Sequence, residues 1–185
     1  IDIPSCVLNI GGISNLTIVS NYDHYDFTSR DIGPGNCLID SWVRKNSNQK
    51  FDESGKLASR GKVNEIILEQ AQELYSNRLN KKTLSLDVND FDVSFARGLT
   101  LEDGTATLTD FTGHIIGTEL MNLLSNVKEK SFKVLICGGG RKNKSLINII
   151  KKRTLADITL KPIDDYGVDG DFVESQAFAF LAIRS

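Results

Sequence analysis

The sequence predicts an α/β fold in which three antiparallel strands are followed by alternating helices and strands. Three short runs rich in β-branched and aromatic residues open the chain, and Gly-rich or Asn-rich turns separate them. Beyond them, amphipathic helical patterns alternate with short apolar runs, and parallel strands need such crossover helices. A length of 185 residues suits about one domain.

The first half of the chain contains the antiparallel strands and two helices. Strands are expected at 5–11, 15–20 and about 24–29, and a short helix at 37–44. A second helix is expected over about 62–76, where apolar residues recur at i, i+3 and i+4. Its predicted buried stripe is Val63, Ile66, Ile67, Ala71, Leu74 and Tyr75. Residues 77–99 are expected to be irregular.

The second half alternates helix and strand. A long helix is expected from Thr100 to about Ser125, because Thr100 and Asp103 resemble a capping box. A strand at 132–137, a helix at 143–152, a strand at 157–160 and a helix at 171–183 follow. This order is that of the ribonuclease-H-like layout, a mixed sheet flanked by helices. We expect one domain over 1–185 with a helical insertion at about 62–126.

Composition excludes several classes of function. The 22 Lys and Arg residues nearly balance 24 Asp and Glu residues, for a net charge of -2, so neither nucleic acid nor a membrane is an expected partner. No apolar run approaches the roughly 20 residues that cross a bilayer. Three cysteines without C-x-x-C spacing are expected to be reduced thiols, which fits a cytoplasmic location. Two histidines are too few for a His-rich metal site or a Ser/His/Asp triad.

Three glycine-rich bends follow predicted strands and are the candidate binding elements. Gly11-Gly12 is either a hairpin turn or a bend whose N–H groups approach an anion. The bend from Asp31 to Asn36 is either an ordinary connection with Asn36 as N-cap or a phosphate site at a helix N-terminus. Gly138-Gly139-Gly140 joins a strand's carboxyl end to a helix, where open α/β sheets bind ligands. We expect all three bends to gather along one rim of the sheet.

The charged residues near the last two helices have two interpretations. Asp171 and Glu174 have the N-cap and N3 spacing that favours a capping box. The alternative is that Glu174 points into a cleft and binds a polar ligand. The basic runs 141–144 and 151–153 are expected to be solvated.

Six stretches resemble the anhydro-N-acetylmuramic acid kinase family. They are 8–17 (LNIGGISNLT), 31–42 (DIGPGNCLIDSW), 51–58 (FDESGKLA), 103–109 (DGTATLT), 137–143 (CGGGRKN) and 174–182 (ESQAFAFLA). Together they span nearly the whole chain, and the Gly-Pro-Gly-Asn loop is the most distinctive. In the wider actin, sugar kinase and Hsp70 superfamily, similar segments form a second phosphate loop, an adenosine loop and a closing helix. Here they correspond to Asn9–Ser14, Gly138–Gly140 and Gly167–Ala177.

The resemblance implies an activity and a set of site residues. The family opens the anhydro bridge of 1,6-anhydro-N-acetylmuramic acid with water and transfers the γ-phosphate of ATP to the sugar's 6-oxygen, with Mg²⁺, in bacterial cell-wall recycling. The implied ATP-binding residues are Gly11, Gly12 and Asn15 at the phosphates, Asp31, Gly33, Gly35 and Asn36 in the same cleft, and Gly138, Gly139, Gly140 and Asn143 at the nucleoside. Glu174 would reach the amino sugar.

The resemblance also implies that an N-terminal half is missing. That half carries the family's first phosphate loop and catalytic aspartate, so no catalytic residue is expected in this chain, and the chain alone is expected to be inactive. Asn9 stands where the superfamily has an acidic residue, and Leu84 and Val88 stand where basic residues are expected. The alternatives are a noncatalytic nucleotide- or partner-binding remnant, and another sugar or acetate kinase. The missing half is the expected partner, and a homodimer stays open.

Overall fold

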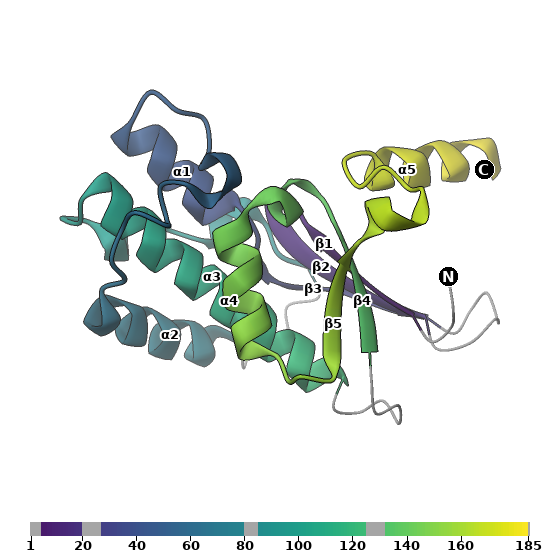
Figure 1. Ribbon diagram of the computed structural model, residues 1–185, viewed down its shortest axis with the longest axis horizontal. Helices are drawn as coiled ribbons and strands as arrows, with labels where there is room; N and C mark the ends of the chain where they lie inside the picture. The colour runs from purple at the N-terminus through teal and green to yellow at the C-terminus, as the bar shows by residue number, and fades with distance from the viewer. Residues whose placement is uncertain (1–4, 20–26, 80–84, 125–131, 185) are drawn as a thin grey trace.

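The computed structural model describes residues 5–19, 27–79, 85–124 and 132–184 (Figure 1). The strands are β1 (Ser5–Ile10), β2 (Ile13–Val19), β3 (Phe27–Pro34), β4 (Phe132–Cys137) and β5 (Ile158–Pro162). The helices are α1 (Cys37–Asn46), α2 (Glu65–Leu79), α3 (Leu101–Leu124), α4 (Lys144–Arg153) and α5 (Val173–Arg184). Short 3₁₀ turns lie between them: η1 (Glu53–Gly55), η2 (Val88–Asp90), η3 (Ser94–Ala96), η4 (Gly139–Lys142) and η5 (Ile163–Tyr166).

The strands form one mixed sheet in the order β3-β2-β1-β4-β5. The first three are antiparallel, and β4 and β5 run parallel to β1, which confirms the predicted fold class. The third strand differs in its bounds: residues 24–26 lie outside the described residues, and β3 runs on to Pro34. It does so because Ile13 and Ser14 of β2 pair with Pro34 and Gly33. Proline is tolerated there because β3 is an edge strand.

The core lies on one face of the sheet. Alternation along β1 and β2 places side chains such as Leu8 and Leu16 against α3 and α4. The C-terminal half of α3 packs on the sheet through Ile116 and Leu120, and its N-terminal half joins α1 and α2 in a second cluster. The extent of the predicted insertion at 62–126 therefore stays a prediction, because α3 belongs to both clusters.

The other face of the sheet is less covered. Helices that we expected on both faces gather mainly on one, and Figure 1 shows α1 to α4 together on that side with α5 apart. Near β4, the second face is closed by Ile163 of η5 and Val173 of α5, which pack on Leu135. Farther toward β3, this face carries the polar side chains described below.

Helix α2 buries part of the predicted stripe. Ala71 is buried and Tyr75 packs in the same cluster, as predicted. Ile66 and Leu74 are instead 70% and 67% exposed, and Leu68 is buried. Both arrangements have helical spacing, so periodicity alone does not choose between them. Contact with α3 selects the Leu68 stripe.

The cysteines agree with the expectation from composition. Cys6, Cys37 and Cys137 are free thiols. Burial raises the pKa of Cys6 to about 12 and the pKa of Cys37 and Cys137 to about 11. Within the described ranges, no helix is long and apolar enough to span a bilayer.

Candidate functional site

The bends after β1, β3 and β4 meet at one rim of the sheet. The N–H group of Gly35 donates to the carbonyl oxygen of Gly12 at 2.9 Å, which joins the first two bends. The third bend lies against the end of β1, because a Cβ atom added to Gly138 would lie only 2.4 Å from Asn9 Oδ1. Gly138 also has a φ of +78°, which a residue with a side chain rarely adopts. The expectation that the three bends gather on one rim is confirmed.

The N–H groups just before α1 and at its first residue are used inside the protein. Gly35, Asn36 and Cys37 all donate to carbonyl oxygens of the Gly11-Gly12 bend. Asn36 makes no side-chain cap bond, and its Nδ2 donates instead to the carbonyl oxygen of Ile10 at 3.4 Å. Asn36 is the N-cap residue of α1, as the first interpretation of this bend expects, although its side chain does not cap the helix. These donors tie the two bends together instead of standing free for a phosphate.

The glycines of the bends divide into packed positions and one open position. At Gly33, Gly35 and Gly140, an added Cβ atom would come within 2.5 Å of a neighbouring residue's atom. At Gly139 the nearest atom would be Asn36 Nδ2 at 3.9 Å. Close packing therefore explains the first three glycines, whereas Gly139 faces open space where a ligand has room to approach.

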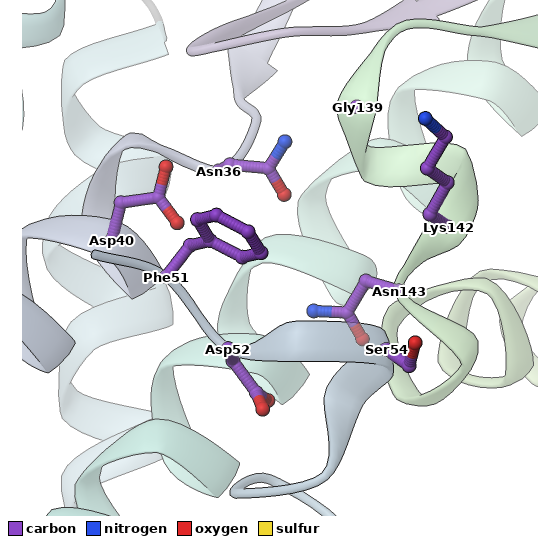
Figure 2. Close-up of a pocket in the computed structure, with 8 residues that line it drawn as sticks. All are labelled: Asn36, Asp40, Phe51, Asp52, Ser54, Gly139, Lys142 and Asn143. Carbon is purple, nitrogen blue, oxygen red and sulfur yellow. The ribbon is translucent and has the colours of Figure 1, made fainter. Parts of the chain in front are cut away.

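A cavity of about 280 Å³ opens beside Gly139 (Figure 2). Residues from α1, the η1 region and the third bend line it: Asn36, Asp40, Phe51, Asp52, Ser54, Gly139, Lys142 and Asn143. The volume is near the lower end of the range for ligand pockets, about 300 Å³. Asn36, Gly139 and Asn143 were expected at the site from the sequence.

Two of the lining side chains hold the walls in place. Asn143 Oδ1 accepts a hydrogen bond from the N–H of Leu146 at 3.1 Å and so caps α4. The Asp52 carboxylate accepts from the N–H groups of Leu57 and Ala58 at 2.7 and 3.1 Å. In Figure 2 this carboxylate points away from the ring of Phe51. Both residues therefore have structural roles, whatever they contact in a complex.

Asp40 is a lining residue that the sequence analysis missed. It is half-buried, and its carboxylate has no hydrogen-bond partner within the described part of the chain. Burial raises the pKa of Asp40 to about 6, although nearby Arg44 acts to lower it. The available signal was spacing, because Asp40 lies four residues after Asn36 and so on the same face of α1.

The sequence analysis also missed Phe51 and Ser54, although the sequence contained an indication that they belong to the site. Both belong to the stretch 51–58, which resembles the family but was given no role. Lys142 was also missed, because the basic run that contains it was interpreted as solvated. It supplies the cationic side chain among the lining residues.

A row of polar side chains crosses the open face of the sheet at the same rim. Asn15 is the register partner of both Asn9 and Asp31. Asn15 Nδ2 donates to Asp31 Oδ1 at 3.1 Å, and Asn9 Nδ2 donates to Glu174 Oε1 at 2.6 Å. Glu174 therefore reaches from α5 to the end of β1. The row meets the cavity at the third bend, because Gly138 abuts Asn9 and Gly139 lines the cavity.

Arg141 joins the third bend to the segment before α5. Its side chain is only 7% exposed, and the guanidinium pairs with Asp164 at 2.8 Å and Asp171 at 2.6 Å. Lys142 also pairs with Asp171. Two expectations are therefore wrong: Arg141 is not on a solvated face, and Asp171 does not cap α5, which begins at Val173. Hydrogen bonding to Arg141 lowers the pKa of Asp164 to about 2.

The described residues offer little to a metal ion by themselves. Among them, no group of three or more His, Cys, Asp and Glu side chains is arranged to hold one. Asp31, the carboxylate of the polar row, already accepts a hydrogen bond from the N–H of Leu86 at 2.8 Å. Mg²⁺ commonly binds one or two carboxylates together with substrate phosphates.

Comparison with protein families gives a match over nearly the whole chain. The family model for anhydro-N-acetylmuramic acid kinase matches residues 2–185. Over all of its length, the chain is 53% identical to the anhydro-N-acetylmuramic acid kinase of Pelagibacter ubique, of which it covers 49%. It is 36% identical over 98% of its length to the Zymomonas mobilis enzyme of the same name and covers 47% of that protein. The chain thus spans about half the length of these curated relatives.

One solved structure has a similar fold. The chain is similar to the activator of 2-hydroxyisocaproyl-CoA dehydratase from Clostridium difficile with bound ADPNP, at a TM-score of 0.50 and 12% identity. The likeness covers 87% of this chain and 55% of that one. At this identity it concerns the fold alone.

Proposed function

The chain belongs to the anhydro-N-acetylmuramic acid kinase family, and from that premise we propose that it forms the nucleotide-side half of such a kinase. The complete enzyme would use ATP and water to convert 1,6-anhydro-N-acetylmuramic acid to N-acetylmuramic acid 6-phosphate. Water attacks the anomeric carbon and gives up a proton to a base, the bond between the anomeric carbon and O6 breaks, and O6 receives the γ-phosphoryl group while ADP leaves.

The observation that carries this proposal is the cavity at the glycine rim. Gly139 leaves room for a ligand beside the carboxyl end of β4, and the cavity holds the cationic Lys142 together with polar side chains. Open α/β sheets bind nucleotides at this position. We assign the nucleoside to the cavity. The phosphates then extend toward the Gly11-Gly12 bend.

The polar row supports a sugar site on the other side of the rim. Glu174, Asn9 and Asn15 present carboxylate and amide groups on the open face of the sheet. Such groups match the hydroxyl and amide groups of an amino sugar. We propose that Glu174 contacts this substrate and that its hydrogen bond with Asn9 positions it beforehand.

We propose that the other half of the enzyme closes the cleft. The chain spans about half the length of its relatives, and α5 exposes Phe178, Phe180 and Ile183. Exposed apolar side chains in such number mark an interaction surface. The catalytic base would come from that half, and Mg²⁺ would enter with the nucleotide phosphates. This chain would supply positioning and charge stabilisation, on which phosphoryl transfer mainly depends.

The test is an assay of the complete enzyme that contains this chain. ATP-dependent phosphorylation of 1,6-anhydro-N-acetylmuramic acid is expected, with formation of ADP and a 6-phosphorylated product detected by mass spectrometry. Glu174→Gln should raise the KM for the sugar more than the KM for ATP. A folded, full-length protein that forms no product would contradict the proposal, and nucleotide binding without turnover would favour a noncatalytic remnant.

A further inference from the structure

The cavity contains a carboxylate that the fold does not use. Asp40 is half-buried on α1 and has no hydrogen-bond partner within the described ranges, whereas Asp52 beside it accepts two bonds from the backbone. A half-buried carboxylate that no protein donor contacts is left to water or to a ligand in the cavity. An ionised carboxylate only accepts hydrogen bonds, so a ligand that replaces this water must offer an N–H or O–H donor.

The surroundings of Asp40 indicate the shape of that partner. Figure 2 shows the ring of Phe51 beside the Asp40 carboxylate, with Asn36 beyond it. Phe51 is 54% exposed although its ring lines a cavity. Gly139, another lining residue, has no side chain to fill the space. An aromatic face in an open cavity suits a planar ring, because bases stack on aromatic side chains whatever their sequence.

The charged side chains that line the cavity indicate how a nucleotide would be oriented in it. Lys142 Nζ lies apart from Asp40 in Figure 2, nearer to Gly139. An anionic phosphate is attracted to the ammonium group, for which it would compete with Asp171, and is repelled by the Asp40 and Asp52 carboxylates. A nucleotide would therefore place its nucleoside at Asp40 and its phosphates toward Lys142.

We propose that Asp40 and Phe51 select the nucleoside: Phe51 stacks on the base, and the Asp40 carboxylate accepts a hydrogen bond from a donor of the nucleoside. This inference rests on the proposed function, because it takes the ligand to be ATP. Two donors share the required chemistry, namely the amino group of adenine and the hydroxyl groups of ribose. Nucleotide analogues that lack one or the other distinguish them.

The main test compares Asp40→Asn with the wild type in the full-length enzyme. The substitution keeps the shape but removes the charge, so the KM for ATP should rise about tenfold while kcat stays within about twofold. With adenine as the donor, purine riboside triphosphate should bind the wild type as weakly as ATP binds the variant. With ribose as the donor, 2′-deoxyATP or 3′-deoxyATP should do so instead. Asp157→Asn, at an exposed turn before β5, is the matched control.

A pH profile adds a readout that a purely structural role would not give. Protonation removes the negative charge and turns one oxygen into a donor, which weakens the carboxyl group as an acceptor. The KM for ATP should therefore rise as pH falls below about 6, the pKa of Asp40. The charged groups that act on the carboxylate are Arg44 on the same helix and the neighbouring Asp52, and Lys142 lines the same cavity farther away. In Asp40→Asn this rise should be absent.

Two further measurements keep the inference open to refutation. Phe51→Leu should raise the KM for ATP, whereas Phe51→Tyr should keep the KM for ATP close to that of the wild type. These two variants test the inference even if Asp40→Asn fails to fold. If the wild type shows no turnover, calorimetric titration with ATP compares it with Asp40→Asn directly, so a failed kinase assignment is told apart from a failed role of Asp40. Equal ATP affinity of wild type and both variants would overturn the inference.

Discussion

At the scale of single residues, Gly139 and Gly140 differ although they are adjacent. A Cβ atom on Gly140 would lie 2.2 Å from Ile10 Cγ2, whereas one on Gly139 would enter the cavity. Gly140→Ala should therefore destabilise the protein by about 1–3 kcal/mol through overpacking. Gly139→Val should leave the melting temperature nearly unchanged and raise the Kd for ATP. Thermal unfolding and ATP titration of both variants check this, and a reversed pattern would contradict the assignment of the cavity.

The residues of the site were only partly predictable from the sequence. Runs of glycine identified the three bends, because strand ends rich in glycine bring backbones together. They did not separate glycines that pack, such as Gly35, from Gly139, since that difference depends on atoms from another strand. Asp40 was missed for the same reason: a single carboxylate on an amphipathic helix has no local signature until the cavity beside it is known.

At the scale of elements, the start of α4 depends on the Asn143 side chain. Its Oδ1 accepts from the N–H of Leu146, and loss of such a cap costs about 0.5–2 kcal/mol. Asn143→Ala should lower the free energy of unfolding by this amount, and Asn143→Ser should retain most of it, as measured by urea denaturation. If the ATP affinity of Asn143→Ser matches the wild type, the role of Asn143 is structural. Equal stability of the two variants would refute the cap.

The link between η4 and η5 should weaken in acid. Arg141 lowers the pKa of Asp164 to about 2, below the unfolded value of about 3.9. Asp164 therefore contributes stability above pH 4, and this contribution is lost as pH falls from about 4 toward 2. The difference in stability between wild type and Asp164→Asn should shrink over that range in urea unfolding at pH 5, 4 and 3. A difference independent of pH would show that the ion pair is not its source.

The order of elements was predictable because local and global signals agreed. Three β-rich runs and then alternating helices leave few topologies open, and the observed strand order follows from them. Details failed where tertiary contacts decide between equal local patterns. The stripe of α2 shifted toward Leu68, and Asp171 bonded to Arg141 instead of capping a helix. In each case the partner lies far away in the sequence.

At the scale of the whole molecule, the cavity and the polar row both open at one rim of the sheet. The N–H groups of Gly35, Asn36 and Cys37 at this rim are occupied by the first bend. These three donors are therefore not free to surround a triphosphate. On the proposed function, further phosphate contacts come from the other half of the enzyme.

The isolated chain should consequently bind ATP more weakly than micromolar. Binding must offset the loss of rotational and translational freedom, and half a cleft supplies only part of the contacts that do so. Calorimetry of the 185-residue chain and of the full-length enzyme would measure the difference, with circular dichroism showing that the isolated chain is folded. Joining the other half should tighten binding without any change in this chain's own residues. A Kd for ATP of micromolar or below in the folded, isolated chain would mean that its wall alone completes the nucleotide site.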